Sequence, residues 1–365
     1  MEFAGCTAVK LTARSGAPYW FRTCDIGGDI WADGAHAVSF PVGARIDLEG
    51  REEPLTVAHA FMGLSYNALD TWLLDGMNDA GLVGGLLALY EATSAQEAAQ
   101  GEEGVSGMEI ITRLLATCAT VDEVICAAQR IRLLDVRIGE THNSANMHCM
   151  FMDPRGRCVI LESTDAGELG RMEVYEENLG LMTNSPTYPQ QLQNLSWYLA
   201  HSPEWNWGKE TTPCITLNGM TVEGDPDAPH FAMSGAFPAS YSSGDRFIRM
   251  AMLSYLNGEG KHFSDKEMLA LGSDLMCSVI EPHNQGVYHY RTFDEKTGPQ
   301  GQNPSYTQYI VMYAPREGAL YVKPYGTTAW TRLRLKPRAG TVVRRHAICR
   351  HPMAGVVEET GKGTI

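Results

Sequence analysis

The chain has little positive charge and no long hydrophobic run. Its 365 residues include 29 Lys and Arg against 43 Asp and Glu, a formal net charge of −14 at pH 7. Partners with a phosphate backbone need clustered basic side chains, so this balance argues against nucleic acid. No stretch approaches the ~18 apolar residues of a membrane span, and residues 1–5 lack the basic and apolar regions of a secretory signal. We expect no nucleic-acid partner, no membrane partner and, by default, a cytoplasmic location.

Familiar motifs for metals, nucleotides and serine esterases are also absent. The nine cysteines, at positions 6, 24, 118, 126, 149, 158, 214, 277 and 349, form no C-x-x-C pair and no Cys/His cluster at zinc spacing. No phosphate-binding loop, dinucleotide-type glycine fingerprint, H-E-x-x-H or G-x-S-x-G sequence occurs. These absences predict free thiols in a reducing compartment, with no metal and no cofactor.

Strand patterns lie at both ends of the chain. The β-branched and aromatic runs Cys6–Ala13 and Pro18–Thr23 are joined by Ser15-Gly16, which predicts a hairpin at the very start. The apolar run Leu82–Leu89, interrupted by Gly84 and Gly85, is typical of a buried central strand whose backbone is closely approached. Further strands are predicted at 37–41, 147–153, 158–163, 172–175, 180–183, 306–314 and 319–324.

Helices are indicated between these strands. Capping boxes at Ser106/Glu109, Thr120/Glu123 and Ser264/Glu267 each open an apolar pattern of helical period, and the first two predict consecutive helices over 106–131. A further helix is expected at 246–256, before Gly258. This order favours one large α+β domain, with helices covering stacked sheets, over an alternating barrel. The segment 202–230 is too long for a simple connection, so we expect a loop with a functional or subunit-contact role.

Cys6 is the residue whose position suggests chemistry. Amide hydrolysis needs a nucleophile, a group that takes and returns a proton, and donors for the oxyanion. Cleavage between Gly5 and Cys6 would free an α-amine with a pKa of about 7.7–8.0, close to the ~8.5 of a free thiol. Arg22, near the other end of the hairpin, would favour the thiolate, and Asp25 would orient the ammonium. The alternative is a buried, inert Cys6 beside a solvated Arg22–Asp25 pair.

Four separated motifs resemble the choloylglycine hydrolase family, which includes bile salt hydrolases and penicillin V acylases among the N-terminal nucleophile hydrolases. They are Cys6 with "FRTCD", where an Arg and an Asp follow sixteen and nineteen residues later, "LDGMNDAGLVGGLL" at 74–87, "LGLMTNSPTYPQQLQNLSWYL" at 179–199 and "FPASYSSGDRFIRMAML" at 237–253. The resemblance covers most of the chain in the family's order. It implies a four-layer αββα sandwich of the N-terminal nucleophile hydrolase type, with residues 1–5 as a removed leader and 6–365 as a single domain.

The resemblance also implies roles for individual residues. Cys6 would be the nucleophile and its own amine the base, with Arg22 and Asp25 tuning and orienting it. Asn184, in "MTNSP", would donate a side-chain N–H to the oxyanion hole, since a neutral amide donates without titrating. Arg246, in "SGDRF", would hold the charge network around the thiolate. From the residues alone, the favoured interpretation of Asn184 is a turn residue before Ser185-Pro186, and that of Arg246 is the start of a helix.

A further oxyanion contribution is expected after the strand at 82–89. Family members usually place an Asn or a Tyr there, whereas this sequence has Ala88, whose backbone N–H is the remaining donor. A shift of the alignment to Leu89 or Tyr90 is the alternative.

The expected activity is hydrolysis of a linear amide through a thioester. The resemblance implies small-molecule N-acyl substrates, either glycine or taurine conjugates of bile salts or penicillin V-like compounds, and a homotetramer. Residues 1–5 would leave by self-cleavage or through a peptidase, and Gly5 suits a tight scissile bond. Two alternatives remain: an acyltransferase that passes the acyl group to an amine, and a catalytically silent member of the fold.

Overall fold

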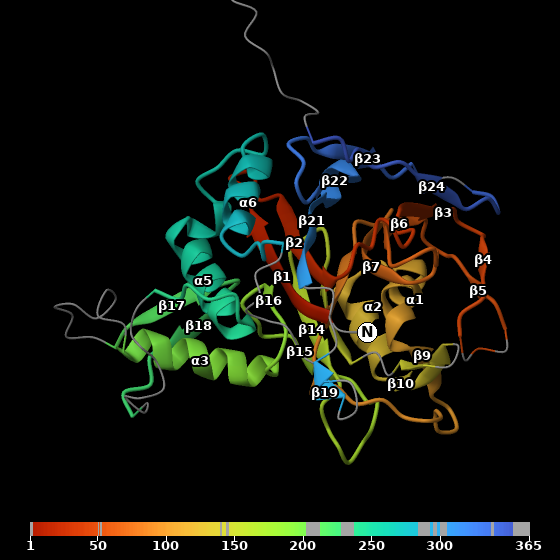
Figure 1. Cartoon of the computed structure of the whole chain (residues 1–365), viewed down its shortest axis with the longest axis horizontal. Helices are drawn as coiled ribbons and strands as arrows, with labels where there is room; N and C mark the ends of the chain where they lie inside the picture. Colours follow the sequence, from red (N-terminus) through yellow and green to blue (C-terminus); the bar gives the residue numbers. More distant parts are fainter. Residues whose placement is uncertain are drawn as a thin grey trace, which may run out of the picture.

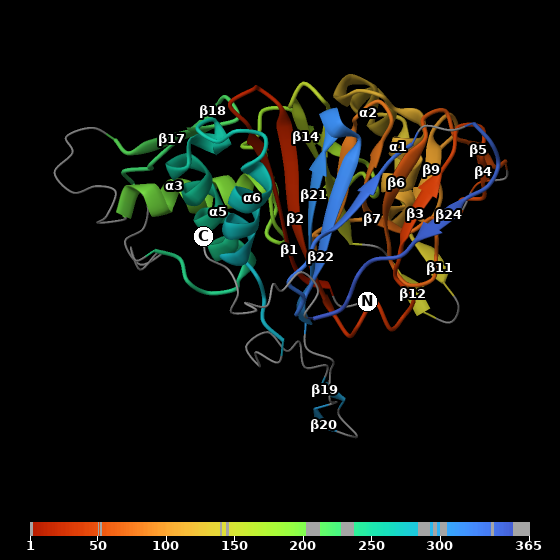
Figure 2. The same ribbon diagram turned by 90° about the horizontal axis from the view of Figure 1, so that it is seen from above.

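Two β-sheets lie face to face at the centre of the molecule, and helices cover both outer surfaces (Figure 1). The computed structural model describes residues 3–49, 51, 53–138, 141–143, 146–201, 212–227, 237–283, 293–294, 298–299, 305–336 and 339–352. Figure 2 shows α3, α5 and α6 on one side of the sheets and α1 and α2 on the other. The predicted αββα sandwich is therefore confirmed.

The six-stranded sheet carries both strands of the predicted N-terminal hairpin. Its order is β16 (Leu181–Met182), β1 (Phe3–Thr12), β2 (Pro18–Gly27), β21 (Ser305–Ala314), β22 (Ala319–Pro324) and β23 (Thr331–Arg334). All neighbouring strands are antiparallel. β1 begins three residues before the predicted start, and β2 continues through Asp25. Each of the two strands has a paired neighbour on both sides.

The eight-stranded sheet faces it. Its order is β15 (Glu173–Tyr175), β14 (Cys158–Glu162), β13 (Met147–Met152), β8 (Val83–Ala88), β7 (Leu73–Asn78), β6 (Phe61–Ser65), β3 (Ala37–Phe40) and β24 (Arg344–His346). The close approach predicted at Gly85 is confirmed, because a Cβ there would overlap the ring of Trp20 in the facing sheet. A larger residue at this position would push the two sheets apart.

The helices pack against the outer faces. α1 (Ile110–Thr117) and α2 (Val121–Ala128) contact the eight-stranded sheet, whereas α5 (Ser243–Leu256) and α6 (Met268–Cys277) contact the six-stranded sheet, and α3 (Tyr188–His201) packs on α5. α6 packs closely, since a Cβ on Gly272 would overlap the Phe21 ring. None of the helices in the described ranges combines the length and the apolar composition that crossing a membrane requires.

Short elements complete the described chain. They are β4 (Arg45–Ile46), β5 (Leu55–Thr56), β9 (Glu103–Ser106), β10 (Ile131–Leu134), β11 (Val136–Ile138), β12 (Thr141–Asn143), β17 (Cys214–Leu217), β18 (Met220–Glu223), β19 (Phe293–Asp294), β20 (Gly298–Pro299), and the 3₁₀ turns η1 (Gly107–Glu109), η2 (Gly258–Gly260) and η3 (Pro315–Glu317).

The capping-box prediction is right at Thr120 and wrong at Ser106. Thr120 Oγ1 accepts the backbone N–H of Glu123 at 3.2 Å, and α2 begins there. Ser106 instead ends strand β9, its side chain makes no cap hydrogen bond, and α1 begins at Ile110 after the turn η1. The same residue spacing therefore occurs where a strand leads into a helix.

Two further boundaries differ from the prediction. Ser264 N–H does bond the Glu267 carboxylate, at 2.7 Å, but this turn precedes α6, which begins at Met268. The predicted loop 202–230 contains the hairpin β17–β18, while residues 202–211 and 228–230 lie outside the described ranges. Asn218 and Gly219 have φ of 50° and 82°, the left-handed pair that a two-residue hairpin turn requires.

Candidate active site

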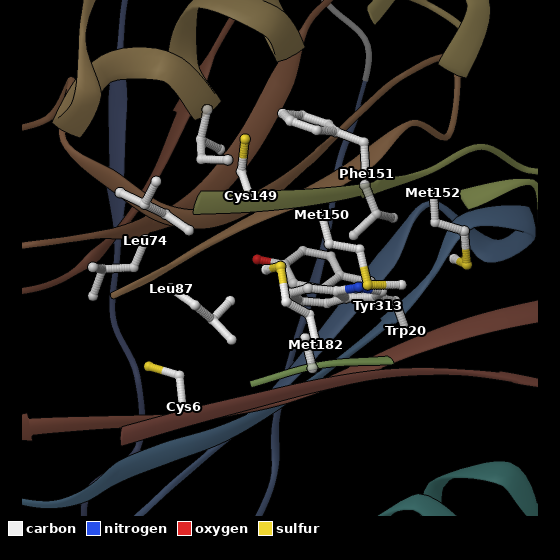
Figure 3. Close-up of a cluster of buried hydrophobic side chains, with 14 of the residues drawn as sticks. Cys6, Trp20, Leu74, Leu87, Cys149, Met150, Phe151, Met152, Met182 and Tyr313 are labelled. Atoms are coloured by element: carbon white, nitrogen blue, oxygen red, sulfur yellow. The ribbon is translucent and has the colours of Figure 1, made fainter. Parts of the chain in front are cut away.

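Cys6 lies on β1, in the layer between the two sheets. Its side chain is 1% exposed, and Figure 3 shows it facing Leu74 of β7 and Leu87 of β8. The backbone of β1 is paired on both sides, with β2 and with β16. The pairing with β2 extends to Cys6, which lies opposite Cys24, whereas β16 pairs with β1 at Ala8 and Val9.

The hairpin brings Arg22 to the sulfur of Cys6. Arg22 Nη2 donates to Cys6 Sγ at 3.3 Å, and its Nη1 forms a 2.8 Å ion pair with Asp75 Oδ2. The hydroxyls of Tyr309 and Tyr313 also donate to the Asp75 carboxylate. Arg22 and Asp75 are 1% and 0% exposed, so the alternative of a solvated arginine is wrong. A buried carboxylate instead holds the guanidinium against the thiol.

These surroundings shift the pKa values of the two neighbouring thiols, Cys6 and Cys24, in opposite directions. Burial alone would raise the pKa of Cys6, but the hydrogen bond from Cys24, the charge and hydrogen bond of Arg22, and the backbone N–H of Asp25 outweigh it and lower this pKa to about 5. Burial, and then the hydrogen bond to Cys6, raise the pKa of Cys24 well above its usual value. At neutral pH the site therefore holds a Cys6 thiolate and a protonated Cys24.

A titration tests this assignment. The ultraviolet thiolate absorbance of the wild type minus that of Cys6→Ser is expected to appear with a midpoint near pH 5, because the charged form dominates above its pKa. Arg22→Leu removes the neighbouring cation and should move the midpoint upward. A wild-type midpoint near the ~8.5 of a free thiol would contradict the assignment.

Arg246 and Asn184 hold the backbone of the same cysteine. Arg246 Nη1 donates to the carbonyl of Cys6 at 2.6 Å and to Thr7 Oγ1 at 2.9 Å, and Nη2 donates to Asn184 Oδ1 at 3.0 Å. The same Asn184 oxygen accepts the N–H of Cys6 at 2.5 Å. Asn184 Nδ2 donates to the carbonyl of Ala88 at 3.0 Å. The Asn184 side chain therefore bridges β1 and the end of β8.

Hydrogen bonds fix the loop that carries Asn184. Its backbone N–H donates to Ser243 Oγ at 2.9 Å, and its carbonyl accepts from Gln191 Nε2 at 3.1 Å. His148 Nε2 lies 2.7 Å from the carbonyl of the preceding residue, Thr183. Elements from both sheets and from α3 and α5 thus position one carboxamide.

Two buried acidic side chains lie on the other side of Arg246. Asp25 Oδ1 accepts the Thr307 hydroxyl at 2.5 Å, and Asp25 Oδ2 lies 3.9 Å from Arg246 Nη1. Glu281 Oε1 lies 3.6 Å from Arg246 Nε. Burial first, and then the charge of Glu281, raise the pKa of Asp25 well above its usual value, and burial likewise raises that of Glu281. One guanidinium therefore faces two carboxyl groups away from water.

The structure brings together the five residues that the sequence singled out for the centre of the site. Cys6, Arg22, Asp25, Asn184 and Arg246 are all at most 3% exposed and form one contact network.

The sixth residue, Ala88, joins the network through its carbonyl, and the donor role of its N–H stays a prediction. Sequence reasoning missed Cys24, Asp75, Thr307 and Glu281. Cys24 and Asp75 stand inside the quoted motifs "FRTCD" and "LDGMNDAGLVGGLL", which was the available signal.

A surface cavity of about 590 Å³ lies away from this network. Its lining includes Phe40 and Met62 with Arg334 and Arg344, and it does not include Cys6.

Comparison with known proteins identifies the family to which this chain is similar. The chain matches the family model "Linear amide C-N hydrolases, choloylglycine hydrolase family" over residues 6–267. It is 22% identical to the bile salt hydrolase/transferase of Clostridium perfringens (strain 13 / Type A) over 320 residues, 79% of this chain and 89% of that protein. It is 30% identical to the penicillin V acylase of Pectobacterium atrosepticum over 145 residues, 39% of this chain and 37% of that protein.

Solved structures share the fold. A variant of the conjugated bile acid hydrolase from Clostridium perfringens gives a TM-score of 0.71 at 20% identity, covering 94% of this chain and 96% of that one. The penicillin V acylase from Agrobacterium tumefaciens gives 0.64 at 19% identity, covering 93% and 90%. The family match begins at Cys6 and spans most of the chain. The chain therefore belongs to the choloylglycine hydrolase family of linear amide C–N hydrolases.

Proposed function

We propose that this protein is an N-terminal cysteine amidase that hydrolyses linear amides of N-acyl compounds, either conjugated bile salts or penicillin V-like substrates, through a thioester. One observation carries the proposal: the sulfur and the nitrogen of one residue are both held by buried polar groups. Arg22 lies 3.3 Å from Cys6 Sγ, and Asn184 lies 2.5 Å from Cys6 N. A residue that supplies both nucleophile and base needs both of its atoms positioned.

Acylation follows from this arrangement. The Cys6 thiolate, stabilised by Arg22, attacks the amide carbonyl, and the oxyanion receives an N–H of Asn184. A carboxamide nitrogen carries two hydrogens, and Ala88 accepts one of them, which leaves the other for the substrate. The protonated α-amine of Cys6 gives its proton to the departing amine. The α-amine, now neutral, then takes a proton from the water that hydrolyses the thioester.

Cleavage between Gly5 and Cys6 has to free that amine, by self-cleavage or through a peptidase. Gly5 continues β1 and pairs with Asp25 of β2, so the leader is joined to the sheet. A Cβ on Gly5 would overlap Glu281 Oε1 and lie 3.0 Å from Arg246 Nη2. Glycine therefore allows the carboxylate and the guanidinium to approach the scissile bond closely.

Gly5→Ala is accordingly expected to slow leader removal. The added methyl group forces the Glu281 carboxylate away from its place beside Arg246. Intact mass during expression should show chains that retain residues 1–5, with turnover reduced in the same proportion. As control, a chain shortened to Met followed by Cys6 should be active once the methionine is removed. Processing of Gly5→Ala at the wild-type rate would contradict this account.

Substrate turnover tests the proposed function itself. Glycine- and taurine-conjugated bile salts and penicillin V are to be compared on one purified preparation whose intact mass begins at Cys6. Release of the free amine from one class supports hydrolysis and names the substrate class. New conjugates formed with added amino acids would favour the acyltransferase alternative. No turnover together with a retained leader would favour the catalytically silent alternative.

The homotetramer implied by the family resemblance belongs to this proposal as well. The segment 202–230 is the proposed contact region, and its described part forms the hairpin β17–β18 beside α3 and α5. In this hairpin alternate residues are exposed, as Cys214 and Thr216 are, while Ile215 and Leu217 are buried.

A further inference from the structure

We propose that Cys24 is a redox partner of Cys6: a peroxide joins the two thiols in a cross-strand disulfide that reversibly blocks the nucleophile. The disulfide itself depends on the geometry of β1 and β2. Its effect on turnover rests on the proposed amidase function.

The strand register places the two residues at the spacing that a disulfide requires. Cys6 and Cys24 are directly opposite in the antiparallel pair β1–β2. Further along the same register, Ala13 N–H donates to Ala17 O at 2.9 Å, which marks a hydrogen-bonded pair. Pair types alternate along an antiparallel ladder, so Cys6–Cys24 is a non-hydrogen-bonded pair with a Cα separation of about 4.5 Å. Disulfides span Cα separations of about 4.4–6.8 Å.

The two sulfurs already lie together. Arg22 Nη2 is 3.3 Å from Cys6 Sγ and 3.8 Å from Cys24 Sγ, so one guanidinium nitrogen contacts both sulfurs. Both are free in the structure. The other two buried strand cysteines differ, because Cys149 faces Leu161 and Cys158 faces Met152 across the β13–β14 pair. Within that strand pair no thiol faces another.

The chemistry balances with hydrogen peroxide as oxidant. The Cys6 thiolate attacks one peroxide oxygen, the O–O bond breaks, and hydroxide leaves, which gives a sulfenic acid at Cys6. The Cys24 sulfur then attacks the Cys6 sulfur, and the S–O bond breaks. The proton of the Cys24 thiol and the hydroxide that leaves Cys6 form one water, and the hydroxide from the peroxide takes up the proton that Cys6 released on ionising to form the second. Two thiols and one peroxide thus give one disulfide and two waters, and an added dithiol reverses the bond.

Cys24 would thereby protect the nucleophile. A sulfenic acid without a neighbouring thiol proceeds to sulfinic acid, which simple thiols do not reduce. The Arg22 guanidinium keeps Cys6 as the more reactive of the two sulfurs.

The test treats wild type, Cys24→Ser and the control Cys158→Ser with hydrogen peroxide, on preparations whose intact mass begins at Cys6. Wild type and Cys158→Ser should lose about 2 Da, the two hydrogens of a new disulfide, and yield a Cys6–Cys24 crosslinked peptide in a non-reducing digest. Cys24→Ser should instead gain oxygen at Cys6. Dithiothreitol should restore wild-type activity to its untreated level but leave Cys24→Ser inactive.

The mass readout needs no substrate, so it is independent of the amidase proposal. Circular dichroism of Cys24→Ser, and of Cys24→Ala as a second variant, checks that the fold persists. Oxygen addition at Cys6 of the wild type without a crosslinked peptide would overturn the proposal. Equal recovery of wild type and Cys24→Ser after reduction would overturn it as well.

Discussion

Replacing Cys6 with serine is expected to lower turnover of the accepted amide by at least about 10³-fold while leaving the fold unchanged. The Arg22 contact that stabilises a thiolate cannot ionise a hydroxyl at neutral pH, so the nucleophile is lost. The substitution changes one atom at a site that is 1% exposed, which adds no volume to the core. The measurement is kcat on the conjugated bile salts and penicillin V, beside near-ultraviolet circular dichroism.

Cys158→Ser is the matched control for this variant. Cys158 is 2% exposed and also lies on a central strand, but it is not part of the network around Cys6. It should keep its turnover. Intact mass must show that the Cys6→Ser chain has lost residues 1–5 as the wild type has, because failure of leader removal would also abolish activity. Full turnover by a correctly processed Cys6→Ser protein would refute Cys6 as the nucleophile.

Arg246→Ala should lower both turnover and stability, each for its own reason. Turnover falls because the guanidinium holds the carbonyl of Cys6 and the side chain of Asn184. Stability falls by about 3–5 kcal/mol, because two buried carboxyl groups, Asp25 and Glu281, lose their shared cation. Protonation of these carboxyls removes the uncompensated charge, so the stability difference should shrink as the pH falls.

Arg249→Ala provides the comparison within the same helix. Arg249 is 6% exposed and donates to the carbonyls of Pro238 and Ser240, away from Cys6. It should lower the midpoint of thermal unfolding without a matching loss of kcat. Arg246→Lys keeps the charge but not the forked geometry and should lie between wild type and alanine in kcat. If Arg246→Ala changed stability alone, Arg246 would be a structural residue of α5 and nothing more.

The hairpin and the contact between Arg22 and Cys6 could be predicted from the sequence because both are local. Arg22 reaches Cys6 across a single turn, so the pairing of two adjacent strands is enough to place the guanidinium at the sulfur. The packing at Gly85 is equally predictable, since a glycine in an apolar strand marks close approach.

Other contacts could not be predicted from the sequence because they depend on segments that are distant along the chain. Glu281 reaches Gly5 and Arg246 from the chain that follows α6, and nothing in "IEPHN" indicates that approach. Asp75 secures Arg22 from the facing sheet, which requires knowing how the two sheets are stacked.

The prediction of a loop over 202–230 overlooked a local hairpin signal within that segment. Asn218-Gly219 between alternating apolar residues is the strongest short hairpin signature, yet the length and composition of the segment predict a loop. At Ser106 a capping-box spacing is present and the 3₁₀ turn η1 starts at the next residue, but the Ser106 side chain makes no cap hydrogen bond.

The crowding at Gly5 bears on the order of folding and the proposed leader removal. Three segments far apart in the chain, around residues 5, 246 and 281, meet there only in the finished fold. If their meeting assists the cut, a nascent or misfolded polypeptide keeps its nitrogen acylated and has no working base beside its sulfur. The free amine and the thiolate of Cys6 would then occur together only in molecules that have folded completely.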